Sequence, residues 1–390
     1  MPVLNRIADY QTDLTAWRRH LHQMPELDLE CFKTASFVVE RLREFGVDDI
    51  HEGIASSGVV ALIHGREPGG TVGLRADMDA LPMTEKSGVD HASQSPGKMH
   101  ACGHDGHTAM LLGAARYLAE TRNFAGTVAL IFQPAEEGSG GGRIMVEEGM
   151  MDRFGIEQVY SLHNAPGVPL GQIEVAPGPV MAAVDTFWID ITGDGGHGAM
   201  PDQTRDPIMT AVALVQALQT IVSRNVPAVQ QVVLTVTQIH SGSGTNIVPD
   251  TAQVVGTVRT FDPVMRDLVE KRLTTITTHQ AAAFDMDATV TYERGYPATV
   301  NHPDGTQSAI RAARDVVGAA NVDDNTMPRM VGEDFSYMLE ARPGAYVFLG
   351  MGDRPQCHHP AYDFDDSVAP VGASYFARLI EMTLPLAKDR

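Results

Sequence analysis

Strand-like and helix-like segments alternate along the first 180 residues, and this alternation limits the possible folds more than any other feature of the sequence. Short apolar runs at residues 58–63, 71–76, 127–132 and 158–162 are typical of buried strands, and apolar side chains recur at helical spacing through residues 107–120. Such alternation predicts an α/β domain with a mainly parallel sheet and helices on both of its faces.

The pattern changes after Pro177. Strands are predicted at residues 184–192, 231–240, 252–261 and 287–293, with helices at 206–224 and 262–284. Their order, β-α-β-β-α-β, indicates a ferredoxin-like arrangement. The chain then returns to α/β character, with a strand at 345–350 and a helix at 371–386. We therefore expect a discontinuous domain of residues 1–180 and 295–390, and an inserted domain of residues 181–294.

Composition argues against several classes of protein. The 49 acidic and 29 basic residues give a net charge of −20, which opposes binding to nucleic acid and to anionic membranes. No apolar run approaches the roughly 20 residues that span a bilayer, and the N-terminal residues lack the pattern of a secretion signal. Three cysteines in 390 residues do not suggest a disulfide framework. We expect a cytoplasmic protein.

One short run combines a thiol with several imidazoles. Residues 99–107 read Met-His-Ala-Cys-Gly-His-Asp-Gly-His and include Cys102 and His104, just before the predicted helix. Thiolate and imidazole together favour zinc or another late divalent metal. Taken alone, the run also fits a loop with solvent-facing histidines.

Two adjacent carboxylates, Glu136 and Glu137, follow the predicted strand at 127–132. We expect neighbouring side chains to point to different sides, so that one binds a metal while the other acts as a general base. The structural alternative is a pair of solvated acids on a loop.

Two further histidines follow predicted strands. His163 lies at the end of the run at 158–162, and His358 follows the strand at 345–350. Each alone is more typical of a structural histidine, but the carboxyl ends of strands form the ligand crevice of open α/β sheets. Several such clusters at one edge predict a metal site. Asp77 and Asp79 either hold a ligand histidine in one tautomer or cap a turn.

With these motifs in place, the sequence resembles hippurate hydrolases, N-acyl-amino-acid amidohydrolases and plant auxin-conjugate hydrolases. They form a branch of the dinuclear-metal aminoacylase and carboxypeptidase family. The resemblance spans nearly the whole chain, and its most specific motifs are Met99–His107, Gln133–Gly138, Gly196–Pro201, Thr245–Pro249 and His358–Phe364. It implies a dinuclear metallopeptidase-like catalytic domain with an inserted lid and dimerisation domain.

The resemblance also implies a role for individual residues. The expected ligands of two divalent ions (zinc, manganese, cobalt or nickel) are Cys102, His104, Glu137, His163 and His358, with His359 as an alternative to His358. Glu136 matches the general base. His197 and Asn246 match substrate-contacting positions of the lid, where the histidine often comes from the partner subunit of a homodimer.

The expected activity is metal-dependent cleavage of N-acyl amino acids to a carboxylic acid and a free amino acid. Three alternatives remain open from the residues. One is a metallo-carboxypeptidase or dipeptidase, and the second is a metal-stabilised binding protein without activity. The third is a cysteine hydrolase with Cys102 as its nucleophile. Sensitivity to a chelator separates the last from the metal enzymes.

Overall fold

The computed structural model describes residues 3–387, which divide into two compact units. The larger unit contains the chain up to Val180, Thr299–Met327 and the chain from Asp334 onward. The inserted unit contains Met181–Ala298 and Pro328–Glu333. Within the described residues, no helix combines the length and the apolar character needed to cross a membrane.

The larger unit is built on an eight-stranded sheet with the order β1-β2-β4-β3-β5-β16-β6-β15. The bounds are β1 (Asp49–Ile54), β2 (Gly58–His64), β3 (Glu67–Asp77), β4 (Ala125–Gln133), β5 (Ile156–Ala165), β6 (Ile173–Glu174), β15 (Val322–Asp323) and β16 (Gly344–Gly350). The central strands β4, β3, β5 and β16 are parallel, whereas β1 and β2 form an antiparallel edge. Almost every residue of β4 and β16 is buried, as expected for strands covered on both faces.

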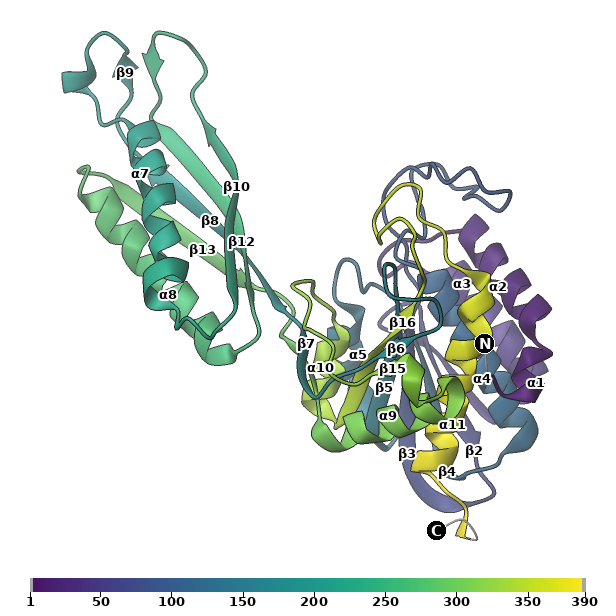
Figure 1. Ribbon diagram of the computed structural model, residues 1–390. Helices are drawn as coiled ribbons and strands as arrows, with labels where there is room; N and C mark the ends of the chain where they lie inside the picture. Colours follow the sequence, from purple (N-terminus) through teal and green to yellow (C-terminus); the bar gives the residue numbers. More distant parts are fainter. Residues whose placement is uncertain (1–2, 388–390) are drawn as a thin grey trace. The chain divides into compact units, whose positions relative to one another are not determined.

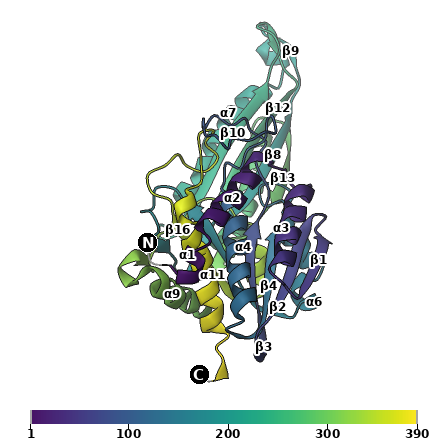
Figure 2. The same cartoon turned by 90° about the vertical axis from the view of Figure 1, so that its right-hand side faces the viewer.

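Helices cover both faces of this sheet (Figure 1). On one face α4 (His104–Thr121) packs against α2 (Gln11–Gln23) and α11 (Ala369–Thr383), and Figure 2 shows these helices in front of the strands. On the other face α5 (Gly141–Glu147) packs against α10 (Phe335–Ala341). The remaining helices of this unit are α1 (Asn5–Ala8), α3 (Phe32–Glu44), α6 (Met150–Arg153) and α9 (Pro303–Val317). Because the helices cover the faces of the sheet, functional side chains can gather at the carboxyl ends of the parallel strands.

The inserted unit has a four-stranded antiparallel sheet with the order β10-β12-β8-β13. Its elements are β8 (Ala183–Thr192), α7 (Pro207–Thr220), β10 (Val232–Ser241), β12 (Thr251–Thr260), α8 (Pro263–Ala282) and β13 (Asp287–Arg294). Figure 1 shows α7 and α8 side by side on one face of the sheet. Both helices begin with proline after an aspartate, Asp206 or Asp262, whose side chain accepts a backbone N–H of the first turn.

The predicted α/β class is confirmed, and so is the mainly parallel centre of the large sheet. Several boundaries differ from the prediction, among them the end of the inserted domain, which reaches Ala298 rather than residue 294. The helix expected at 107–120 begins at His104, because Gly103 with φ 89° turns the chain directly before it. The helix expected to reach residue 224 ends at Thr220 and continues as a π-helical turn, Ile221–Asn225.

Candidate metal centre

The five predicted ligands lie at the carboxyl ends of the parallel strands of the larger unit. Cys102 and His104 stand at the beginning of α4, and Glu137 follows β4. His163 lies near the end of β5, and His358 follows β16. The turn into α4 depends on Gly103, where an added Cβ would come within 2.5 Å of the Tyr362 hydroxyl. The topology thus brings together residues from four separate parts of the sequence.

These side chains approach one another at the spacing of ligands around a cation. Sγ of Cys102 lies 3.4 Å from Nε2 of His163, and Oε1 of Glu137 lies 3.0 Å from Nε2 of His358. One ligand atom each from Cys102, His104 and His163 falls within 4.8 Å of the others, and so does one each from Cys102, Glu137 and His358. The two groups share the Cys102 thiol. Zinc binds such atoms at about 2.0–2.3 Å, so each group is compact enough for one ion.

Glu136 and Glu137 lie closer together than the expected divergence of their side chains implies. One oxygen from each carboxylate lies within 4.8 Å of the other and of a His104 nitrogen. The physical reason is local: β4 ends at Gln133, and both glutamates sit in the turn that follows, where side chains do not alternate as they do in a strand. Glu136 is buried and lies in the same group of candidate ligand atoms as Glu137.

Two non-glycine residues of the site adopt left-handed backbone conformations. Ala135, directly before the glutamates, has φ 59°, and His358 has φ 67°. Such conformations cost roughly 1–2 kcal/mol each and persist where the surroundings hold them. The N–H of His358 donates to the Ala101 carbonyl at 2.8 Å, and the Ala135 carbonyl accepts the N–H groups of Gly140 and Gly141. These bonds fix the two loops that carry Glu137 and His358.

Asp79 connects two predicted ligands. Its two carboxylate oxygens accept the backbone N–H groups of Glu136 and Glu137, each at 3.0 Å. Oδ1 of the same carboxylate lies 3.4 Å from Nδ1 of His104. Asp79 therefore caps the turn that carries the two glutamates and also lies beside His104. The contacts fit both roles considered from the sequence, capping a turn and orienting a ligand histidine.

Asp77 belongs to a buried network that extends behind the ligands. Oδ1 of Asp77 lies 2.5 Å from Nδ1 of His107, and its Oδ2 accepts a hydrogen bond from Arg75 at 2.7 Å. Arg75 also donates to Gln133 at 2.9 Å and to Asp334 at 3.0 Å. Sequence reasoning missed Arg75 and Asp334. A lone arginine inside an apolar strand was the available signal, because a buried guanidinium needs carboxylate partners.

Burial and charged neighbours shift the pKa values of the histidines in this cluster. Burial lowers the pKa of His104, but the carboxylates of Asp77, Asp79 and Glu137 outweigh burial and raise that pKa to about 10. Burial and the neighbouring rings of His107 and His104 hold the pKa of His163 well below its usual value. His163 is therefore neutral, the form in which imidazole binds a metal.

The residues fit a divalent cation. Among the described residues, neither ring nitrogen of the buried His104 makes a hydrogen bond, and the carboxylates of Asp77, Asp79 and Glu137 stand 3.4–3.9 Å from them. Buried polar atoms without hydrogen bonds are rare, and a bound cation is a standard explanation for them. Carboxylates, imidazoles and one thiol form a donor set suited to zinc, manganese, cobalt or nickel.

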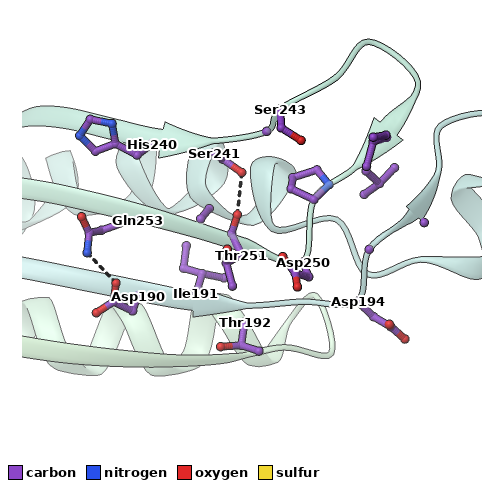
Figure 3. Close-up of a pocket in the computed structure, with 17 residues that line it drawn as sticks. Asp190, Ile191, Thr192, Asp194, His240, Ser241, Ser243, Asp250, Thr251 and Gln253 are labelled. Atoms are coloured by element: carbon purple, nitrogen blue, oxygen red, sulfur yellow. Dashed lines mark hydrogen bonds between the residues drawn. The ribbon is translucent and has the colours of Figure 1, made fainter.

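The two predicted lid residues belong to the inserted unit. His197 in β9 (Gly196–His197) pairs with Ile247 in β11 (Ile247–Val248), and the Gly198 N–H donates to the Asn246 carbonyl at 2.8 Å. His197 is therefore held close to Asn246. A polar groove of about 1150 Å³ lies beside them, and its lining includes Gly196 and Ile247. Figure 3 shows this groove with other lining residues, among them Asp194 and Asp250. All residues lining this groove belong to the inserted unit.

The comparisons with known proteins agree with this geometry. The model of peptidase family M20/M25/M40 matches residues 73–382. N-acetyl-L-cysteine deacetylase of Bacillus subtilis is 43% identical over 372 residues, which cover 95% of this chain and 88% of that protein. Hippurate hydrolase of Campylobacter jejuni is 37% identical over 379 residues, which cover 97% and 98% of the two chains.

A solved structure shares both the fold and the sequence pattern. A dinuclear metal binding peptidase of the M20 family from Bacillus subtilis is 33% identical, with a TM-score of 0.85. The alignment covers 97% of this chain and 99% of that one. The similarity in sequence and fold therefore extends over both compact units.

Proposed function

Because this chain belongs to peptidase family M20/M25/M40, we propose that it is a metal-dependent amidohydrolase that cleaves N-acyl amino acids to a carboxylic acid and a free amino acid. The observation that carries the proposal is the buried Glu136 carboxylate, which lies against the candidate ligands His104 and Glu137. A protein that only bound a metal would not need a further carboxylate there. Two of the relatives, a hippurate hydrolase and an N-acetyl-L-cysteine deacetylase, support this substrate class.

We infer that two divalent ions bind, one in each group of donors. His104 and His163 would hold one ion and Glu137 and His358 the other, with the Cys102 thiol common to both groups. When bound, such ions supply Lewis-acid activation of water and of the amide carbonyl. Zinc, manganese, cobalt and nickel all suit this donor set.

Glu136 acts as the general base in this proposal. Its carboxylate takes a proton from the attacking water and delivers the proton to the leaving amine nitrogen. Asp79 keeps Glu136 in place through the backbone hydrogen bond at 3.0 Å. His197 and Asn246 bind the substrate, and His197 stabilises the oxyanion that forms on the carbonyl.

We further propose a homodimer formed through the inserted unit. Strand β10 is an edge of its sheet, and α7, which packs beside β10, exposes Ile208, Met209 and Val212. Ile239 on β10 is 51% exposed. Unpaired strand edges and exposed apolar clusters are typical of interfaces, and a second copy of the same strand provides a matching edge. In such a dimer, His197 would serve the site of the partner subunit.

Three free thiols support a cytoplasmic location.

A substrate panel tests the proposed function. The protein is loaded with each of the four metals and offered hippurate, N-acetyl amino acids, a dipeptide and a longer peptide, and the released amino acid is measured. We expect turnover of the N-acyl amino acids that disappears after chelation and returns with metal. Turnover confined to peptides would assign a peptidase instead, and turnover that survives chelation would support the cysteine hydrolase.

A further inference from the structure

Cys357 is a second thiol at the candidate metal centre, and the proposed reaction does not use it. Its Sγ donates to the carbonyl oxygen of Cys102 at 3.8 Å. The residues next to them are also joined, because the His358 N–H donates to the Ala101 carbonyl at 2.8 Å. The two cysteines therefore lie on neighbouring chain segments that are hydrogen-bonded to each other.

The surroundings of Cys357 hold its sulfur in place. Nδ2 of Asn164 donates to this sulfur at 3.4 Å and to the Tyr362 hydroxyl at 2.9 Å. Cys357 is partly exposed, whereas Cys102 is 8% exposed. A small oxidant therefore reaches Cys357 first, with Cys102 as the nearest thiol behind it. The third cysteine, Cys31, is fully buried and contacts Ser57 and the Asp28 carbonyl instead.

We propose that Cys102 and Cys357 form a reversible disulfide when the metal-free protein meets a peroxide, and that bound metal prevents this reaction. The first clause depends only on the two thiols. The second clause rests on the proposed function, in which the Cys102 sulfur is bound to metal and cannot attack another sulfur. The site would thus be open to peroxide only while it lacks metal, and the disulfide would then block metal uptake.

The reaction balances with hydrogen peroxide as the oxidant. The Cys357 thiol attacks one peroxide oxygen, the O–O bond breaks, and a sulfenic acid and one water form. The Cys102 thiol then attacks the sulfenic sulfur, the S–O bond breaks, the S–S bond forms and a second water leaves. Two thiols are oxidised by two electrons and one peroxide is reduced to two waters. A dithiol reductant reverses the step by thiol–disulfide exchange.

Mass spectrometry of the full-length protein tests this pair. Chelated and metal-loaded samples receive one equivalent of hydrogen peroxide, free thiols are alkylated, and tryptic peptides are analysed. In the chelated sample we expect the free thiols to fall from three per chain to one, with a peptide linking Cys102 to Cys357. The metal-loaded sample should keep all three. Treatment with dithiothreitol should restore the thiols and the capacity to take up zinc.

Two single variants serve as matched controls. Cys31→Ser should still form the linked peptide, whereas Cys357→Ser should not and should keep its Cys102 thiol. Absence of the linked peptide from the chelated wild type would overturn the thiol pair, whatever Cys102 binds. Equal formation of the linked peptide in the chelated and loaded samples would overturn the protection and would place the error in the ligand role of Cys102.

Discussion

Oε1 of Glu137 lies 3.0 Å from Nε2 of His358, although one residue follows β4 and the other follows β16. This contact forms only when the carboxyl ends of the strands meet at one edge of the sheet. The hydrogen bond to Glu137 is the main reason why the pKa of His358 is raised above its usual value. A divalent cation between the two groups would replace that ion pair, so the pair marks the position of a ligand site.

Replacing His358 by alanine should weaken metal binding. Loss of groups that merely support metal ligands typically costs 10- to 100-fold in affinity, and we expect His358→Ala to lose about that much or more. The measurement is metal content after dialysis against a graded chelator. His359→Ala is the matched control, since the His359 ring accepts a local hydrogen bond from the N–H of Ala361 at 3.1 Å. A larger loss in the control would make His359 the ligand.

Asp79→Asn should lower activity about 10- to 100-fold, as is typical for partners that orient metal ligands. The amide offers only one acceptor oxygen, whereas the Asp79 carboxylate accepts the N–H groups of both glutamates. Steady-state kinetics with metal analysis on the same samples measures the effect. Asp28→Asn is the control, because Asp28 binds the exposed end of the same turn through Ser139. Equal losses in the two variants would assign Asp79 to general loop stability.

His22→Gln should remove a pH-dependent part of the folding stability. Burial and the nearby Arg18 lower the pKa of His22. The carboxylates of Asp105 and Glu85 outweigh both and raise this pKa to about 9. A raised histidine pKa stabilises the fold fully below the unfolded value of about 6.5 and loses that contribution as pH rises through about 9. The shift corresponds to at most about 3 kcal/mol.

Urea unfolding between pH 6 and pH 10 measures this contribution. The free energy of unfolding of the wild type should fall relative to that of His22→Gln across the window from about 6.5 to about 9. A constant difference between the two proteins would mean that His22 contributes packing but no charge.

Met209→Asp should convert the proposed dimer to a monomer. Met209 is 55% exposed on α7, so the fold tolerates the charge, but an unpaired carboxylate in an apolar interface is costly. Light scattering coupled to gel filtration gives the molar mass. Val264→Asp is the control, because Val264 is 65% exposed on α8, away from the proposed interface strand. A wild type that runs as a monomer, or a variant that stays dimeric, would contradict the interface.

Much of the architecture could be predicted because apolar periodicity reveals the strands and helices locally, and general topology rules then say how parallel strands assemble. The run at 127–132 lies within β4, and the residues at 184–192 form nearly all of β8. The convergence of His163 and Glu137 followed from the rule that parallel strands present their carboxyl ends together. The ligand motif at Cys102 and His104 was visible as a rare combination of residue types.

Other parts depend on long-range contacts that periodicity does not encode. The contact between Arg75 and Asp334 joins residues from distant parts of the chain, and only the folded sheet brings them together. The convergence of Glu136 and Glu137 depends on the left-handed conformation of Ala135, a residue type that rarely adopts it. The nearness of Cys357 to Cys102 likewise depends on how the loop after β16 folds back on Ala101.

The most direct test of the account compares Glu136→Gln with the wild type for hydrolysis of hippurate and N-acetyl amino acids, with metal content measured on the same samples. Glutamine keeps the shape of the side chain but does not accept the proton. We predict that the variant binds the same amount of metal as the wild type and that its kcat falls about 100-fold or more, in line with the loss of a general base. A variant that retains both its metal and near-normal turnover would contradict the proposed mechanism.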